Sequence, residues 1–216
     1  MKLDSHIHSS YSSDSSSKIE DILNKSRNIG LDIIGISDHD TIEGSKIAIK
    51  ESQKYEDILV IPSIEISSAS GHILGFGVEE KVPMNLSPDE TIDRIHELGG
   101  LAIIPHPYSF YRYGLFHKVE GEKLKVDAIE ILNAKYFLGY GNYKSEKHAK
   151  KQSIPEIGAS DAHKIEYIGD CFTEIECEMN IDSVLKNIKK GKVKACGKGT
   201  SYLTIYKNKI IKKVFK

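Results

Sequence analysis

The sequence predicts an α/β protein in which a parallel sheet is wrapped by helices. Short apolar runs alternate with amphipathic segments about seven times along the chain, which is typical of repeated βα units. No run of about 18 apolar residues occurs, so no membrane span is expected. No GxGxxG or GxxxxGK[ST] motif follows a predicted strand, so the common nucleotide-binding fingerprints are absent. An open doubly wound sheet and a closed barrel are both compatible with this pattern.

The individual elements follow in order from the apolar spacing and from helix start and stop signals. Strands are expected over 3–7, 32–37, 58–66, 72–78, 101–104, 127–132, 155–159 and 171–176. Helices are expected over 18–29, 43–55, 87–98, 142–152 and 181–190. Ser17 and Glu20 have the spacing of a capping box for the first helix, and Ser87 with the following proline begins the third. Gly30 and Gly191 are expected to end two of the helices.

Length and charge favour one compact domain over residues 1–216. The chain has 216 residues, 30 Lys and Arg against 31 Asp and Glu, and a formal net charge of −1, which argues against a dedicated non-specific nucleic-acid binder. The polar start leaves no apolar stretch for a signal peptide, so a cytoplasmic location is expected. Cys171, Cys177 and Cys196 form no CxxC pair, which favours reduced thiols over a disulfide framework.

Metal-ligand types of side chain follow six of the predicted strands. In chain order they are Asp4, His6 and His8, then Asp38, His39 and Asp40, then Glu65, His106, Asn133, and finally Asp161 and His163. In a closed barrel the carboxyl ends of the strands lie on one face, so these side chains would converge. Imidazoles and carboxylates without thiolates suit Zn, Mn, Fe or Ni. The set is too large for one ion of about four to six ligands, which indicates two or three divalent ions.

The spacing of the histidines adds detail to this prediction. His6 and His8 stand two residues apart on a strand, so both side chains point to the same face. His72 lies on the strand beside Glu65, where it would either support a ligand or contact a phosphate. The remaining histidines are expected to have no role in the site, and they are His96, His117 and His148.

Together, these segments resemble the PHP (polymerase and histidinol phosphatase) domain family. The matching stretches are DSHIHSSYSSD (4–14), ISDHDT (36–41), PSIEIS (62–67), IIPHP (103–107), IEILN (129–133) and GASDAH (158–163), in the order that the family has them. The resemblance implies a distorted (β/α)7 barrel with a cluster of two or three metal ions at the carboxyl ends of the strands. It also implies a metal-dependent phosphoesterase.

The resemblance further implies a role for each ligand-type residue. A first metal would be held by His6, His8, Glu65 and Asp161, a second by Glu65 and His106, and a third by Asp14, His39 and His163. Asn133 stands where some members have His or Cys, so it is either a weak ligand or a substrate contact. Asp14 is like the branch that includes small nucleotide phosphatases and exonucleases. The stretch between residues 78 and 106 is too short for the insertion domain that this branch often carries.

The predicted function is hydrolysis of a small phosphate monoester by a metal-activated hydroxide. Three divalent ions carry a charge of +6, and three carboxylates with one hydroxide leave about +2, which matches a phosphate dianion. The candidates for the proton donor to the leaving group are Asp161, His163 and His39, and those for binding the substrate are Arg112, His72 and Lys135. The expected cofactors are two or three ions of Mn, Zn or Fe.

Three alternatives stay open. A phosphodiesterase or 5′-3′ exonuclease on short nucleic acid would use tyrosines near the same mouth to stack bases, and these are Tyr108, Tyr111, Tyr113 and Tyr136. A non-catalytic barrel subunit would have no physical need for the ligand set. The third alternative is that the metal centre hydrolyses a lactone or an amide instead of a phosphoester. Nucleic acid is expected only as a substrate, and no membrane partner is expected. The Lys-rich segment 193–216 is expected to form a terminal hairpin or an edge strand.

Overall fold

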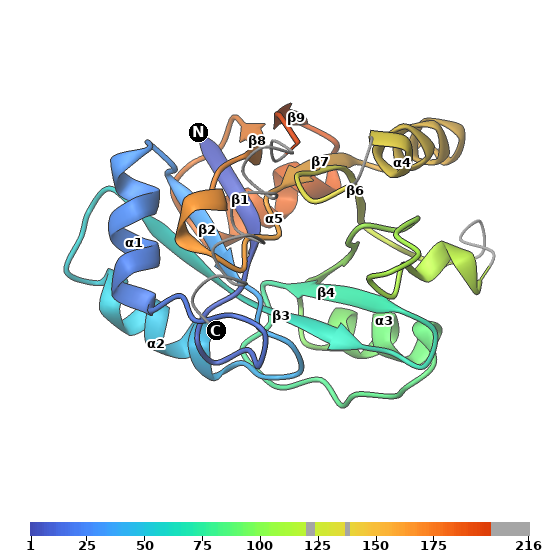
Figure 1. Ribbon diagram of the computed structural model, residues 1–216, viewed down its shortest axis with the longest axis horizontal. Coiled ribbons are helices and arrows are strands. Elements are labelled where there is room, and N and C mark those ends of the chain that lie inside the picture. The colour runs from blue at the N-terminus through green and yellow to red at the C-terminus, as the bar shows by residue number, and fades with distance from the viewer. Residues whose placement is uncertain (120–123, 137–138, 200–216) are drawn as a thin grey trace, which may run out of the picture.

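The computed structural model describes residues 1–119, 124–136 and 139–199 (Figure 1). The strands are β1 (Lys2–Ile7), β2 (Ile33–Ile36), β3 (Leu59–Ser67), β4 (His72–Phe76), β5 (Leu101–Ile104), β6 (Ala128–Asn133), β7 (Glu156–Ala159), β8 (Cys171–Ile175) and β9 (Val193–Gly197). The helices are α1 (Ile19–Asn28), α2 (Glu43–Ser52), α3 (Pro88–Glu97), α4 (Tyr140–Gln152) and α5 (Ile181–Lys189). Every strand and helix expected before residue 193 is present, with ends shifted by a few residues.

The strands form a nine-stranded sheet that closes almost into a barrel. Its order is β7-β6-β5-β4-β3-β2-β1-β8-β9. Strands β1, β2 and β3 pair in parallel, and so do β5, β6 and β7. Ile7 at the end of β1 forms a parallel bridge with Ala162, just beyond β7, so the β7 end of the sheet comes back to β1 and the barrel almost closes. The distorted barrel that the resemblance implies is therefore confirmed.

The expectation of a wholly parallel sheet is wrong for three strands. Strand β4 runs antiparallel to both β3 and β5, β8 runs antiparallel to β1, and β9 runs antiparallel to β8. The turn at residues 68–71 is too short for a crossover, so β4 has to fold back on β3. As a result His72, the first residue of β4, lies at the barrel end where the parallel strands finish. Glu65 lies inside β3 rather than at its end.

Strand β9 pairs along β8 and forms one end of the sheet order, as expected for the start of the C-terminal segment. The rest of that segment, from residue 200 on, lies outside the described residues.

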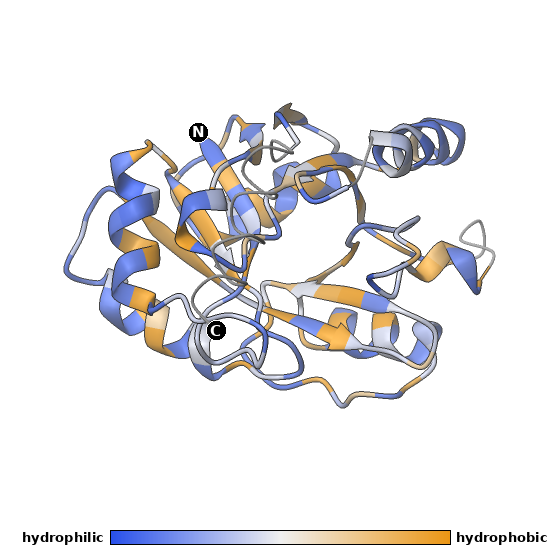
Figure 2. Cartoon of the chain, in the orientation of Figure 1, coloured by the Kyte–Doolittle hydropathy of each residue, from blue (hydrophilic) through white to orange (hydrophobic). Residues whose placement is uncertain are grey.

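Apolar side chains fill the spaces between the sheet and the helices. Ile22 and Leu23 of α1 share a buried cluster with Ile34 and Ile36 of β2. Figure 2 shows hydrophobic residues along the strands and hydrophilic residues on the outer faces of the helices. Among the described residues, no helix has both the length and the apolar character that a membrane crossing requires. The apolar interior leaves the strand ends as the place where polar side chains gather.

The two predicted helix starts have different outcomes. Ser87 caps α3 in a full capping box: its Oγ accepts the Glu90 N–H, and the Glu90 side chain accepts the Ser87 N–H. The box predicted at Ser17 and Glu20 is wrong, because the N-cap of α1 is Lys18 and no side chain caps it. Ser17 instead belongs to the preceding loop, where its backbone carbonyl accepts a hydrogen bond from the Ser10 N–H at 2.8 Å.

We expect Ser87→Ala to lower the free energy of unfolding by about 1 kcal/mol, because it removes the acceptor of the capping box. Urea denaturation followed by circular dichroism measures this change. Ser17→Ala is the matched control, since it removes a serine hydroxyl that caps no helix, and its effect should be smaller. An equal loss of unfolding free energy in the two variants would contradict the assignment of Ser87 as the cap of α3.

Candidate metal centre

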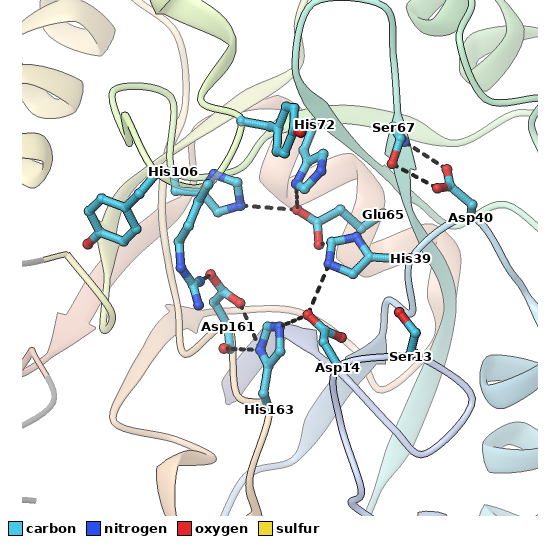
Figure 3. A pocket seen from close by; sticks show the side chains of 13 residues that line it. Ser13, Asp14, His39, Asp40, Glu65, Ser67, His72, His106, Asp161 and His163 are labelled. Atoms are coloured by element: carbon cyan, nitrogen blue, oxygen red, sulfur yellow. Dashed lines mark hydrogen bonds and ion pairs between the residues drawn. The ribbon is translucent and has the colours of Figure 1, made fainter. Parts of the chain in front are cut away.

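Eight ligand-type side chains lie close together: six line one pocket of about 510 Å³, and the fully buried His6 and His8 lie against Glu65. The eight are His6, His8, Asp14, His39, Glu65, His106, Asp161 and His163. Figure 3 shows a ring of side chains around a common space, formed by His106, His72, Glu65, His39, Asp14, His163 and Asp161. The structure thus places together residues that are distant in the sequence, and their role as ligands stays a prediction.

The backbone at two of these positions has an unusual conformation. His106 has φ of 31° and Asp161 has φ of 51°, which are rare values for residues other than glycine. Each residue follows a parallel strand, β5 or β7, at the point where the chain leaves the sheet. Such conformations are costly and are concentrated at functional sites. The chain therefore has local strain at two of the candidate ligands.

The first ligand group is the most deeply buried. His6 Nε2 lies 3.0 Å from His8 Nε2, and both atoms lie 3.2 Å from Glu65 Oε2. Asp161 Oδ1 lies 3.8 Å from His6 Nε2 and 3.6 Å from His8 Nε2. Metal–ligand bonds of about 2.1 Å allow two ligands of one ion to lie up to about 4.2 Å apart. His6, His8 and Asp161 therefore fit a single ion, and Glu65 Oε2 lies beside both histidines.

The second group surrounds the other oxygen of Glu65. Glu65 Oε1 lies 3.0 Å from His106 Nε2 and 2.8 Å from His72 Nδ1. His6, Glu65 and His106 form one potential metal group, and His39, Glu65 and His72 form another. His72 is thus a further ligand candidate, beside the substrate role expected for it. The sequence placed His72 on the strand beside Glu65 but gave no sign that its ring reaches that carboxylate directly.

The third group contains Asp14, which lies in the Ser-rich loop after β1. Asp14 Oδ2 lies 2.7 Å from His163 Nε2 and 3.5 Å from His39 Nε2. Ser12 Oγ donates to Asp14 Oδ1 at 2.7 Å, and Ser15 Oγ donates to the His163 carbonyl at 3.2 Å. The serines of this loop therefore position Asp14 against the end of β7. The donor set of all three groups consists of imidazoles and carboxylates, which fits Mn, Zn or Fe.

The electrostatics act in different directions on the candidate ligands. Burial opposes the charge of His6 and His39, but neighbouring carboxylates outweigh it and raise the pKa of His6 well above its usual range and that of His39 to about 9, so a metal ion would have to displace a proton from each. Burial lowers the pKa of His8 to about 4, which leaves its imidazole neutral.

Burial opposes the charge of Glu65, but the neighbouring histidines hold the pKa of that carboxyl well below its usual range. Burial likewise opposes the charge of Asp161, and the nearby Arg112 and Lys135 outweigh it, so the pKa of Asp161 is lowered. The carboxylates are therefore ionised.

Two of the predicted substrate-binding residues lie against the ligand groups. Arg112 Nη1 pairs with Asp161 Oδ2, and Arg112 also lines the pocket. Lys135 Nζ lies 3.5 Å from Asp161 Oδ1 and contacts His163 Nδ1. Burial lowers the pKa of Lys135 to about 8. One guanidinium and one ammonium group therefore stand at the edge of the cluster.

Glu130 is a residue that the sequence analysis missed. It lies inside β6 with no solvent exposure, and its Oε1 lies 2.8 Å from His6 Nδ1. Its Oε2 accepts the His106 N–H at 3.1 Å and the Asn133 side-chain amide at 2.9 Å. The amide oxygen of Asn133 accepts the Lys135 N–H at 3.0 Å. A charged residue within the apolar run 128–132 is the signal that could have identified Glu130.

Three histidines lie outside these ligand groups among the described residues. His96 Nε2 lies 2.6 Å from Asp127 Oδ2, which also accepts the Ala102 N–H, near the amino ends of β5 and β6. The rings of His117 and His148 contact Tyr108. None of the three was expected to have a role in the site.

We expect His96→Ala to leave the metal content and turnover at the wild-type level. The variant should lower the free energy of unfolding by about 1–2 kcal/mol, because it leaves a buried carboxylate with one donor fewer. Metal analysis, an activity assay and urea denaturation of the same preparation measure the three quantities. Loss of metal in this variant would contradict the placement of His96 outside the centre.

Comparison with known proteins agrees with this geometry. The family model for the PHP domain matches residues 4–139, and the PHP-associated model matches residues 139–193. An uncharacterized protein of Methanocaldococcus jannaschii is 37% identical over 144 residues, which are 62% of this chain and 82% of the relative. A second protein from that organism is 33% identical over 127 residues, and the match spans 56% of this chain and only 53% of the relative.

Solved structures at low sequence identity share the fold. A two-domain protein from Bacteroides vulgatus, which contains a predicted PHP-like metal-dependent phosphoesterase, has a TM-score of 0.78 at 17% identity. The match covers 92% of this chain and 65% of that protein. PsfC from Pseudomonas syringae has a TM-score of 0.69 at 14% identity, over 100% of this chain and 98% of its own. Because the PHP model alone covers more than half of the sequence, the chain belongs to the PHP domain family.

Proposed function

We propose that this protein is a metal-dependent phosphoesterase that hydrolyses a small phosphate monoester. The observation that carries the proposal is the combination, in one pocket, of adjoining metal-ligand groups with the cationic side chain of Arg112. The PHP family and the PHP-like neighbours support a general hydrolase or phosphoesterase role. The monoester is the substrate class that the charge of the pocket favours.

Two or three divalent ions would be held by residues that the pocket brings together. The first would be held by His6, His8 and Asp161, with Glu65 as the fourth ligand that the family resemblance implies. The second would be held by Glu65 and His106, and the third by Asp14, His39 and His163. His72 lies 2.8 Å from the same oxygen of Glu65 as His106. Divalent ions in such a centre lower the pKa of water to near 7 and polarise phosphoryl oxygens. Mn, Zn and Fe suit this donor set equally well.

The side chains around the ligand groups would bind and orient the substrate. The planar guanidinium of Arg112 can donate to two phosphate oxygens at once, whereas the ammonium of Lys135 acts as a point charge. Both groups contact Asp161, so a phosphate beside this carboxylate would be within reach of both. Their positive charge would balance the phosphate dianion and favour its binding over that of a neutral amide or lactone.

The proton for the leaving group would come from a histidine at the pocket wall. His39 and His163 are partly exposed and line the pocket, so a leaving oxygen could reach them. Asp161 is buried and held as an anion by Arg112 and Lys135, which makes it the poorest proton donor of the three candidates. In a centre with two ions, without the third, His39 and His163 are free of metal and are the proposed donors.

The experiment that tests this proposal compares chelator-treated protein with protein reloaded with Mn²⁺, Zn²⁺ or Fe²⁺. We expect two or three ions per chain, and release of inorganic phosphate from members of a monoester panel only after reloading. Bound metal together with phosphate release supports the proposal. No tightly bound metal and no turnover after reloading would exclude it.

One observation favours the exonuclease alternative as a second candidate. Tyr111 and Tyr113 line the pocket, yet they are 60% and 66% exposed. Exposed aromatic rings beside a phosphate site can stack on the bases of single-stranded nucleic acid. Hydrolysis of dinucleotides without hydrolysis of free monophosphates would support this alternative over the monoester phosphatase.

A further inference from the structure

We infer that Glu130 is the positioning residue of the metal centre: its carboxylate sets the tautomer of His6 and holds the backbone of His106. The inference rests on the metal-binding part of the proposed function, and it adds a residue outside the ligand groups. Glu130 is not a ligand candidate itself, because it belongs to none of the potential metal groups among the described residues.

Each nitrogen of the His6 ring faces a different set of polar side chains. On one side, His6 Nδ1 lies 2.8 Å from Glu130 Oε1. On the other side, His6 Nε2 lies 3.0 Å from His8 Nε2 and 3.2 Å from Glu65 Oε2. A carboxylate oxygen accepts from an N–H, so this geometry places a hydrogen on His6 Nδ1. The Nε2 atom faces the ligand group and would supply the lone pair to a bound metal ion.

The other oxygen of Glu130, Oε2, accepts the His106 N–H at 3.1 Å, and the backbone of His106 has the unfavourable φ of 31°. This hydrogen bond holds the backbone of His106 in a conformation that residues other than glycine rarely adopt. His106 Nε2 lies 3.0 Å from Glu65 Oε1. One carboxylate of β6 therefore positions candidate ligands from β1 and from the loop after β5.

Only a carboxylate satisfies the partners of Glu130. Three donors converge on Glu130: the ring of His6 on Oε1, and the His106 N–H and the Asn133 amide on Oε2. A glutamine has one carbonyl oxygen, so its NH₂ group would face donors on one side or the other. Glu130 is completely buried, so no water can accept a hydrogen bond from the donors that a glutamine would leave unpaired. Glu130→Gln therefore keeps the shape of the side chain and removes one acceptor.

The direct test reads the tautomer of His6 in chelator-treated wild-type protein by long-range ¹H–¹⁵N NMR of ¹⁵N-labelled histidines. The His6 signals are identified by their loss in His6→Gln. The spectra are followed upward in pH until the His6 imidazolium signal is lost. For the neutral ring we expect the Nδ1–H tautomer in the wild type and a shift away from it in Glu130→Gln. The Nε2–H tautomer in the wild type would overturn the inference without any need for Glu130→Gln to fold.

A second measurement is the affinity for Zn²⁺ or Mn²⁺, obtained by competition with a chelator. Glu130→Gln should bind about 10–100-fold more weakly than wild type, as expected when an outer partner of a ligand is lost. Glu156→Gln, on the neighbouring strand β7, is the matched control and should bind as the wild type does. Wild-type affinity in Glu130→Gln would overturn the inference. Metal binding without phosphoester hydrolysis would exclude the proposed function and leave the role of Glu130 standing.

Discussion

Glu65→Gln is expected to lower kcat/KM for phosphoester hydrolysis by about 10³-fold or more and to reduce the metal content per chain. The Oε2 atom of Glu65 lies 3.2 Å from His6 Nε2 and from His8 Nε2, while its Oε1 lies 3.0 Å from His106 Nε2. A single substitution thus disturbs two ligand groups at once. Metal ions supply several kcal/mol to such reactions, and each 1.36 kcal/mol is a factor of ten in rate.

The measurement combines metal analysis of the purified variant with phosphate release under saturating Mn²⁺ or Zn²⁺. Glu51→Gln is the control, because Glu51 lies on α2 and pairs only with Lys54 among the contacts described; it should match the wild type in both assays. Full metal content with wild-type turnover in Glu65→Gln would contradict the proposed centre.

Arg112→Ala is expected to lower kcat/KM for a phosphate monoester by about 100-fold while the metal content stays at the wild-type level. The guanidinium lines the pocket and pairs with Asp161, so it is placed to donate to phosphate oxygens. Hydrogen bonds to charged groups are worth about 1.5–3 kcal/mol, which corresponds to about 10–100-fold in rate. Arg112→Lys should recover only part of the loss, because an ammonium cannot donate in the planar two-pronged manner.

Steady-state kinetics on the best monoester found in the panel, with metal analysis of each preparation, measure these effects. Arg94→Ala is a suitable control, since Arg94 lies on α3 and pairs with exposed Glu97. Unchanged kinetics in Arg112→Ala would refute the substrate-binding role. Loss of bound metal would show instead that Arg112 supports the ligand groups.

The sequence pattern was sufficient to predict a sheet wrapped by helices, and the family resemblance selected a barrel over an open doubly wound sheet. The pattern is local: apolar runs of strand length alternate with amphipathic helices, and His106 or Asp161 follows such a run directly. Once the sheet closes, strand ends lie on one face whatever their separation in the chain. Asp14 was the exception, because its Ser-rich loop has no local pattern, and only the family resemblance indicated its role.

Tertiary structure decided the features that depend on long-range pairing. The antiparallel direction of β4 brings His72 to within 2.8 Å of Glu65. The short stretch between the two apolar runs requires that direction, but the register that places His72 beside this carboxylate depends on how the two strands pair. Glu130 and His6 are 124 residues apart in the chain, yet their side chains are in contact. The partners of a buried charge are determined by which strands pair and in which register, and that information is distributed over the whole chain rather than contained in any one segment.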